Sequence, residues 1–184
     1  VKATLYAPEY QTTCQVALEN EYLPFLYPNQ YVWFTKDTEA IALAEEVVTP
    51  ADTDLDAVAL VYDYVTSHVT YDWDKAKTVE SDYLPDVDEV LRSGKGICFD
   101  YAALMAAMLR SQKIPTRLEI GYAGTTYHAW ISTYITDVGW VNGIIRFDGT
   151  DWSLMDPTLA SSESSKKLRK FISDGQQYRT CYLY

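Results

Sequence analysis

The sequence predicts a single α+β domain in which helices come first and an antiparallel sheet follows. Two observations lead to this prediction. In the first part of the chain, apolar residues recur at intervals of three and four, the spacing of one helix face. Beyond Pro115 they alternate in steps of two, as in half-buried strands. The strand segments are short and follow one another through turns, so hairpin pairing and an antiparallel sheet are expected.

Helical periodicity is most regular in residues 97–112. This segment is apolar on nearly all sides and rich in alanine, which is typical of a central helix packed closely by other elements. Residues 69–85 have aromatic side chains but no period, and they are predicted to form a long loop of the functional kind. The predicted helices cover residues 37–48, 52–68, 86–92 and 97–112.

Alternation predicts four strands after Pro115, with Asp148-Gly149 as a hairpin turn between the last two. Residues 15–34 mix aromatic and β-branched side chains with two prolines, which favours short irregular strands and a turn at Tyr27-Pro28-Asn29. The four predicted strands are Leu118–Tyr122, Tyr127–Tyr134, Trp140–Phe147 and Asp151–Met155.

Length and composition indicate one domain over residues 1–184. A chain of 184 residues with 48% hydrophobic and 22% charged residues can bury its own core. We divide it into an irregular β extension (1–35), a core (37–160) and a C-terminal segment (161–184). Sixteen tyrosines and five tryptophans suggest an aromatic core or cleft.

The charge of the chain bears on its partners. A formal net charge of -11 argues against nucleic acid or an anionic membrane surface as a partner. A basic or neutral substrate suits this charge better, although an acidic surface also serves solubility alone. No apolar run approaches the roughly 20 residues of a transmembrane segment. Because the chain begins at Val1, we expect a signal or anchor to have been removed, with the protein extracellular or at the cell surface.

Of the three cysteines, Cys14 and Cys181 lie near opposite ends of the chain. They could form a disulfide in an exported protein, or remain two unrelated thiols, and the sequence favours neither. Cys98 is the candidate nucleophile, because it follows two glycines and opens the predicted central helix. The positive end of that helix should lower the pKa of the thiol, and its free N–H groups could receive an oxyanion. The ordinary alternative is a buried structural cysteine.

A cysteine nucleophile needs a base, and the chain has only two histidines. His68 ends a predicted helix, where a solvated imidazole is the usual outcome. His128 lies in a predicted strand within His-Ala-Trp and is therefore preferred. Asp156 follows a short predicted strand and precedes Pro157, so it could orient the imidazole from an adjacent strand. No spacing typical of a metal site is present, and we expect neither a metal nor a cofactor.

Three blocks together resemble the transglutaminase-like superfamily, in the single-domain form found in bacteria. They are Gly96-Ile-Cys98-Phe-Asp100, His128-Ala-Trp130 and Asp156-Pro-Thr158, with Gly121-Tyr between the first two. The resemblance covers roughly residues 55–160 and implies a papain-like core, in which the Cys98 helix packs on the sheet that bears His128 and Asp156. It also implies that these three residues form a catalytic triad.

Other site residues follow less directly. The resemblance also implies a further oxyanion donor upstream of Cys98, but no glutamine or tryptophan there stands in a motif that matches the superfamily's. Tyr71 and Trp73 are the candidates for this role. Tyr101, Tyr122 and Trp130 are candidates for the substrate cleft, although core packing is the favoured role for them. Asp100 could equally compensate the helix dipole or act at the site.

The function expected from these residues is cysteine-dependent acyl transfer on a protein or peptide substrate through a thioester. Water as acceptor would make the chain a peptidase or amidase, and we favour this outcome. An amine acceptor would make it a cross-linking transglutaminase. A binding module that has kept the fold and lost catalysis is the third possibility. The sequence leaves the oligomeric state open.

Overall fold

The structure is a computed structural model. It describes residues 2–7, 10–15, 20–123, 125–147, 152–154 and 178–184. Side chains are described for residues 20–122, 125, 127–141 and 179–184.

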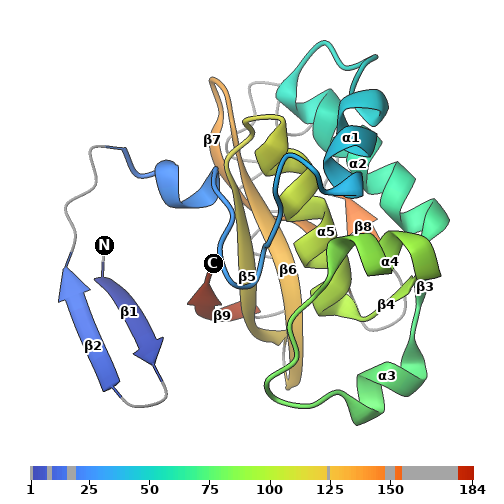
Figure 1. Ribbon diagram of the computed structural model, residues 1–184. Coiled ribbons are helices and arrows are strands. Elements are labelled where there is room, and N and C mark those ends of the chain that lie inside the picture. The colour runs from blue at the N-terminus through green and yellow to red at the C-terminus, as the bar shows by residue number, and fades with distance from the viewer. Residues whose placement is uncertain (1, 8–9, 16–19, 124, 148–151, 155–177) are drawn as a thin grey trace.

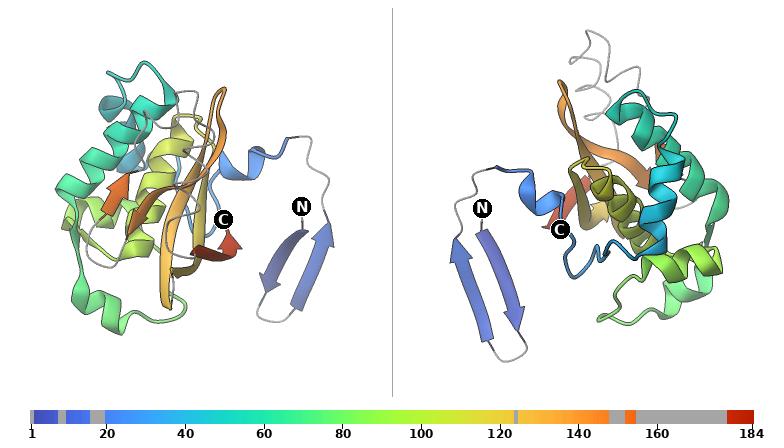
Figure 2. Two further views of the ribbon diagram at one scale, coloured as in Figure 1. Left: turned by 180° about the vertical axis from the view of Figure 1, so that it is seen from behind. Right: turned by 45° about the horizontal axis from the view of Figure 1, so that its top comes forward.

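The main body has two layers, a group of helices and a five-stranded antiparallel sheet (Figures 1 and 2). The strand order in the sheet is β8-β7-β6-β5-β9. The helices cover one face of this sheet, which confirms the predicted α+β class. The larger helices are α1 (Glu39–Val47), α2 (Asp54–His68), α4 (Val87–Ser93) and α5 (Cys98–Ser111). The strands are β5 (Thr116–Ala123), β6 (Thr126–Ile135), β7 (Gly139–Phe147), β8 (Trp152–Leu154) and β9 (Tyr178–Leu183).

Helix α5 is the centre of the core, as its sequence predicts. Every residue from Asp100 to Arg110 is buried, and α5 contacts α1, α2, α4 and the strands β5 and β6. Its four alanines leave room for these neighbours to approach closely from several sides. The first residue of this fixed helix is Cys98, so the packing of the core determines where the thiol lies.

Strand β9 is an element that the sequence analysis missed. It pairs antiparallel with β5, and so the C-terminal segment becomes an edge of the sheet. Gly121 makes this pairing possible, because a Cβ atom there would lie 2.1 Å from the backbone oxygen of Arg179. The glycine of the Gly121-Tyr block therefore has a packing reason that is independent of catalysis.

The N-terminal part differs from the prediction. Strands β1 (Lys2–Ala7) and β2 (Tyr10–Gln15) form a separate antiparallel pair. The short strands expected in residues 15–34 are absent from the described residues 20–34, where the regular element is the 3-10 helix η1 (Leu23–Phe25). Pro24 lies in the first turn of η1, a position that suits its fixed φ and missing N–H.

The segment predicted as one long loop also contains regular structure. Strand β3 (Thr70–Tyr71) pairs in parallel with β4 (Lys95–Gly96), and helix α3 (Trp73–Thr78) follows. The side chain of Asp72 caps α3 by accepting from the N–H groups of Asp74 and Lys75, at 3.2 and 2.8 Å. A six-residue helix is too short to show periodicity, and this cap was the signal available in the sequence.

Arg110 connects three parts of the chain from inside the core. Its guanidinium donates to the carbonyl oxygens of Thr116 (2.9 Å), Tyr27 (2.9 Å) and Tyr184 (2.6 Å). Burial lowers the pKa of Arg110 to about 9, which still leaves the group charged at neutral pH. One buried cation thus holds the N-terminal segment and the end of β9 against helix α5.

Within the described residues, no helix is both long and apolar enough to cross a lipid bilayer.

Replacement of Arg110 by Met should lower the free energy of unfolding by at least about 3 kcal/mol, because three carbonyl groups, one buried and two partly buried, lose a charged donor. Urea unfolding followed by tryptophan fluorescence would measure the change. Arg92→Met is the matched control: Arg92 pairs only with exposed carboxylates of Glu39 and Glu89, and its loss should cost less than about 1 kcal/mol. Equal effects of the two substitutions would contradict the role assigned to Arg110.

Candidate active site

Cys98 is held at the beginning of α5 by a buried carboxylate. Asp100, in the first turn of the helix, accepts a hydrogen bond from the N–H group of Ile97 at 2.8 Å. This contact fixes the backbone just before Cys98. Gly96 is required beside it, because a Cβ atom at that position would lie 2.8 Å from the Cβ of Asp100. The Gly-x-Cys-x-Asp spacing is therefore a structural unit that sets the position of the thiol.

The same carboxylate binds the segment that leads through α3. Lys75 forms an ion pair with Asp100 at 2.7 Å, and the hydroxyl of Tyr83 also donates to Asp100. Lys75 is in turn 2.6 Å from the Tyr83 hydroxyl. A fully buried carboxylate requires such partners. The sequence suggested dipole compensation or action at the site for Asp100, and the structure adds an architectural role: Asp100 joins residues 72–83 to the first turn of α5.

The sulfur of Cys98 is surrounded by hydrogen-bond donors. The backbone N–H groups of Ala129 and Phe99 and the hydroxyl of Tyr71 are directed at it, and each contact lowers the pKa of the thiol. Burial has the larger, opposite effect, so the pKa of Cys98 lies above its ordinary value. The expectation of a lowered pKa was therefore wrong, because it considered the helix terminus without the loss of solvent. The resting sulfur is a thiol that has donors in place for a negative charge.

Tyr71, one of the two oxyanion candidates, contacts Cys98 itself. Its hydroxyl lies against both the side chain and the backbone N–H of Cys98. Burial raises the pKa of Tyr71, as does the contact with the Cys98 side chain, and these effects outweigh the backbone contact, which lowers it. Tyr71 is thus a neutral donor at physiological pH. Trp73 packs against it with ring centroids 4.6 Å apart, and 53% of Trp73 is exposed. Tyr71 therefore contacts the sulfur of Cys98, and Trp73 packs on the ring of Tyr71.

His128 is buried on β6, in register with Gly121 of β5. It directly precedes Ala129, whose N–H group is directed at the Cys98 sulfur. Burial lowers the pKa of His128 below its ordinary value. The ring is therefore neutral at pH 7, the form that can accept a proton.

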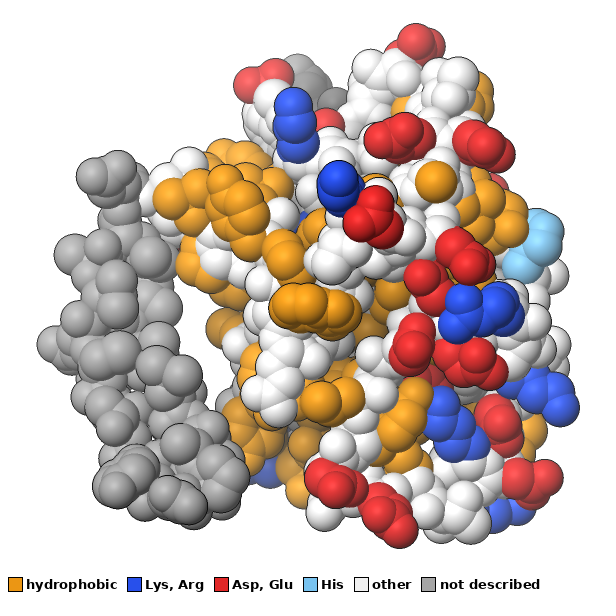
Figure 3. Space-filling model, viewed as in Figure 1, with side chains coloured by type: hydrophobic (Ala, Val, Ile, Leu, Met, Phe, Trp, Pro, Cys, Tyr) orange, Lys and Arg blue, Asp and Glu red, His pale blue; other side chains and the backbone are white. Residues whose placement is uncertain are grey.

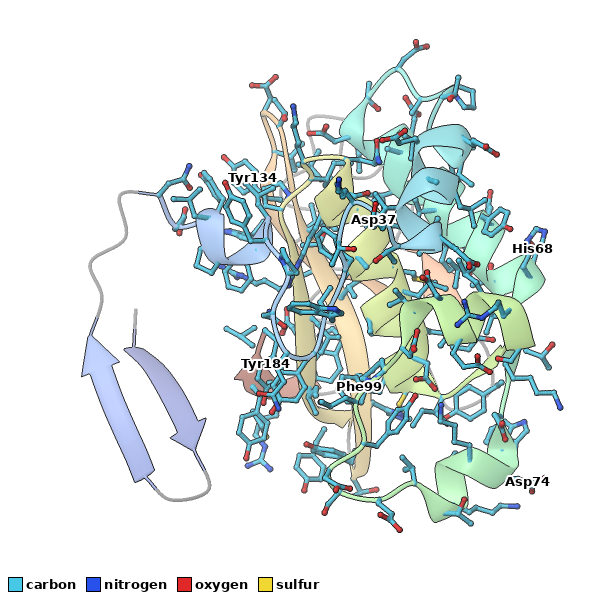
Figure 4. All side chains as sticks on the ribbon, viewed as in Figure 1. Asp37, His68, Asp74, Phe99, Tyr134 and Tyr184 are labelled. Atoms are coloured by element: carbon cyan, nitrogen blue, oxygen red, sulfur yellow. The ribbon has the colours of Figure 1, made fainter. Side chains whose placement is uncertain are left out.

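The other histidine lies elsewhere. His68 is exposed at the end of α2, where its ring stacks on Tyr64 with centroids 4.0 Å apart. Its Nδ1 atom lies 2.8 Å from the backbone oxygen of Tyr64. Figure 4 shows His68 at the edge of the helical layer, well away from Phe99, which is next to Cys98 in the chain. The preference for His128 over His68 agrees with this arrangement.

Cys98 and His128 open into one pocket of about 650 Å³. About half of its lining residues are aromatic, and they come from six parts of the chain: the N-terminal segment, residues 71–83, residues 97–99, β5, β6 and the C-terminal segment that includes β9. Figure 3 shows hydrophobic side chains gathered on the side of the molecule near β9, while acidic side chains spread over the helical side. The lining residues are Tyr31, Tyr71, Trp73, Ala76, Val79, Glu80, Ser81, Tyr83, Ile97, Cys98, Phe99, Ile120, Tyr127, His128, Ala129, Tyr182 and Tyr184.

The three residues named as cleft candidates do not line this pocket. Tyr101 is buried in the core and donates its hydroxyl to the backbone oxygen of Val69. Trp130 is also buried. Tyr122 is partly exposed and contacts the pocket residue Tyr127 edge to face, with centroids 5.3 Å apart. Core packing, the favoured alternative for these residues, describes Tyr101 and Trp130.

The sequence analysis missed most of the aromatic wall. Tyr31, Tyr182 and Tyr184 come from segments assigned to an extension and a tail, yet all three line the pocket. The rings of Tyr31 and Tyr184 lie 3.9 Å apart, although 153 positions separate them in the chain. The high tyrosine content was the available signal, but composition does not locate side chains.

Asp156 lies outside the described residues, and its role stays a prediction. The strand before it, β8, is separated from β6 by β7 in the sheet. The expectation that the strand before Asp156 is adjacent to the strand of His128 was therefore wrong, because β7 lies between the two. Both β6 and β8 pair antiparallel with β7.

The remaining cysteines and metal ligands can be stated briefly. Cys181 is a free, exposed thiol on β9, and the side chain of Cys14 lies outside the described residues. Among the residues that the structure describes, no group of three or more His, Cys, Asp or Glu side chains could hold a metal ion.

Comparison with known families follows this geometry. The model of the transglutaminase-like superfamily matches residues 41–143, which is more than half of the chain. The chain belongs to this superfamily. A curated relative, the UPF0252 protein MJ1282 of Methanocaldococcus jannaschii, is 31% identical over 90 residues, a match that covers 42% of this chain and 26% of the relative.

Two solved structures share the fold. A candidate cysteine protease from Cytophaga hutchinsonii is 24% identical with a TM-score of 0.55, over 67% of this chain and 41% of that one. The periplasmic domain of TgpA from Pseudomonas aeruginosa is 20% identical with a TM-score of 0.52, over 84% of this chain and 51% of that one. The chain thus spans about a quarter to a half of the length of these relatives.

The donors around the sulfur lead to a prediction on pH. Alkylation of Cys98 by iodoacetamide, in a background with Cys14 and Cys181 changed to Ser, should rise with pH to a midpoint above that of a free thiol. Tyr71→Phe removes a donor to the thiolate, so the midpoint should move up further, by about one pH unit. Mass spectrometry of the labelled peptide gives the rate. Tyr27→Phe, at an exposed ring outside the pocket, should change nothing, and a midpoint unmoved by Tyr71→Phe would contradict the contact.

Proposed function

We propose that this chain catalyses cysteine-dependent acyl transfer on amide or peptide substrates, with Cys98 as nucleophile, His128 as base and Asp156 as the residue that orients His128. The observation that supports this most is the convergence at Cys98. Its sulfur meets two backbone N–H groups and the Tyr71 hydroxyl, in a pocket that also contains a neutral imidazole. A buried structural cysteine needs none of these partners.

The chemical steps follow from the protonation states. The Cys98 thiol and the His128 imidazole are both neutral at rest. As the sulfur attacks the carbonyl carbon, its proton moves to His128. The C–N bond then breaks, and the amine leaves with the proton from His128, which leaves a thioester on Cys98. A water molecule deprotonated by His128 attacks the thioester, releases the acid and returns the thiol.

The donors at the sulfur serve the charged states along this path. Negative charge develops first on sulfur and then on the carbonyl oxygen in the tetrahedral intermediate. The N–H groups of Phe99 and Ala129 and the Tyr71 hydroxyl are already oriented toward the sulfur, so little reorganisation is needed. Tyr71 is our candidate for the side-chain oxyanion donor, and Trp73 supports its ring. Loss of Tyr71 should therefore affect turnover more than substrate affinity.

Exposure of the pocket favours water over an amine as acceptor. Trp73, Tyr127 and Tyr182, all in the pocket wall, are 53%, 55% and 54% exposed. These exposed rings leave a path by which water can reach a thioester at the buried sulfur, whereas transfer to an amine requires that water be excluded. We therefore place hydrolysis of a peptide or amide first. Cross-linking with an amine is the second candidate, and a non-catalytic binding module on the same fold is the third.

We also propose that the protein acts outside the cytoplasm, at the cell surface or beyond it. The support is one relative of similar fold, the periplasmic domain of TgpA. Protease protection of the protein in intact and lysed cells of its source would test this placement.

The enzymatic proposal is tested by trapping the thioester. Purified protein is incubated with a library of short glutamine-containing peptides, with and without a fluorescent primary amine. Mass spectrometry should detect an acyl adduct on Cys98, and product analysis should give hydrolysis in excess of amine transfer. Cys98→Ala should abolish both products, and His128→Gln should lower the rate by at least about a hundredfold, the size of a general-base contribution.

His68→Gln is the matched control, because His68 is exposed and lies at another part of the fold. It should retain full activity. The pH profile adds a second criterion: since burial lowers the pKa of His128, its acid limb should fall below the ordinary histidine value of about 6.5. The enzyme proposal fails if no adduct forms on Cys98 and the loss of His128 leaves its reactivity unchanged.

Asp156→Ala should lower the rate strongly, by at least about a hundredfold, while the protein stays folded, because the imidazole loses its orienting partner. Circular dichroism and urea unfolding would establish that the fold is retained. Asp137→Ala, at an exposed position in the turn between β6 and β7, is the control and should keep its activity. If Asp156→Ala unfolds the domain instead, the residue is structural; if activity persists, another group orients His128.

A further inference from the structure

The pocket around Cys98 combines tyrosine rings with a single formal charge. Glu80 is the one Asp, Glu, Lys or Arg among the described lining residues, and the pKa values of Cys98 and His128 keep both of these groups neutral at pH 7. Six lining residues supply phenol rings, and four of them, Tyr31, Tyr127, Tyr182 and Tyr184, come from the N-terminal segment, β6 and the C-terminal segment. The faces of such rings are electron-rich and attract cations.

Nearby basic groups are already occupied. Lys75 is bound by the buried carboxylate of Asp100 at 2.7 Å and lies 4.2 Å from the centre of the Tyr83 ring. Arg179, on β9, lies 5.1 Å above the ring of Tyr122, outside the lining. A negative charge in the pocket therefore has no basic partner among the described lining residues.

The protein itself binds guanidinium groups on aromatic rings. Arg117 lies 3.5 Å from the centre of Trp140 and 4.9 Å from that of Phe25, and Arg179 lies over Tyr122. Guanidinium groups on β5 and β9 thus lie over aromatic rings elsewhere in this fold. A net charge of -11 adds a long-range attraction for a basic peptide.

We infer that the pocket selects a peptide substrate with an arginine or lysine side chain beside the scissile amide, bound over the rings of Tyr127 and Tyr182 with its charge toward Glu80. This inference rests on the proposed acyl transfer at Cys98 and adds the substrate class to it. The cation is a recognition element and not the reacting amine. An arginine serves the purpose as well as a lysine, although its guanidinium is not an acyl acceptor.

The experiment separates binding from catalysis. Fluorescent peptides that differ at a single position, beside a fixed glutamine, carry arginine, lysine, norleucine, phenylalanine or glutamate there. Their binding to the Cys98→Ala protein is measured by fluorescence anisotropy. Arginine should bind about tenfold more tightly than norleucine, the effect of one carboxylate contact and ring contacts together. Glutamate should bind most weakly, and raised salt should reduce the advantage of arginine.

Matched variants locate the site. Glu80→Gln should reduce the ratio of arginine to norleucine affinity from about tenfold to about threefold, because the rings alone remain. Asp82→Asn is the control for net charge: Asp82 is exposed in the same segment but does not line the pocket, and it should leave the ratio unchanged. Tyr182→Leu should also reduce the ratio, whereas Tyr27→Leu, at an exposed tyrosine outside the pocket, should not.

Several outcomes would overturn the inference. Equal or tighter binding of the norleucine or phenylalanine peptide would show an apolar subsite. An equal effect of Asp82→Asn and Glu80→Gln would show a general electrostatic attraction without a subsite. These results concern binding to a protein without its nucleophile, so they are independent of the thioester test. If arginine is preferred but no adduct forms on wild-type Cys98, the proposed acyl transfer fails and the binding preference stands.

Discussion

The buried carboxylate of Asp100 is the constraint on which the site depends. It accepts the Ile97 N–H that precedes the nucleophile, and it binds Lys75 and Tyr83 from the segment that carries Tyr71. The first turn of α5 and the wall of the pocket are thus fixed by one group. A carboxylate with no exposed surface would be costly without these contacts, so the three partners are needed for folding as well as for position. The dipole of α5 adds a further reason for a negative charge at this end of the helix.

The pKa of Cys98 reflects two opposing effects, burial of the sulfur and hydrogen bonds donated to it. Burial raises the pKa of the thiol and lowers that of His128, and both changes favour the neutral pair over a thiolate and an imidazolium. The donors around the sulfur act in the opposite direction. Such a site keeps the nucleophile protonated until a substrate is bound and moves the proton during attack. The sequence argument placed Cys98 correctly at the helix terminus, but it could not weigh desolvation, which depends on residues far away in the chain.

What the sequence predicted well was local or periodic. Helix α5 was predicted from its apolar and alanine pattern, and β5 and β6 from alternation, because both signals arise within a few residues. Helix α3 and strand β9 were missed for two different reasons. Six residues of α3 give no period, and β9 belongs to the sheet only through pairing with β5, for which Gly121 provides the room. In the same way, Cys98 and His128 stood out by residue type, whereas the ring of Tyr184 in the pocket depends on how the chain end folds back.

The stability of the fold and the shape of the pocket are coupled through Arg110. Its guanidinium holds the carbonyl of Tyr27, four residues before Tyr31, and that of Tyr184. The rings of Tyr31 and Tyr184 then contact each other in the pocket wall, tilted, with centroids 3.9 Å apart. The wall therefore consists of two chain segments whose positions depend on one cation in the core. A change on the far side of α5 that weakens this cation would alter the aromatic surface that the substrate meets while it leaves Cys98, His128 and their donors in place. Selectivity in this fold can thus vary through the terminal segments, with the chemistry at the centre unchanged.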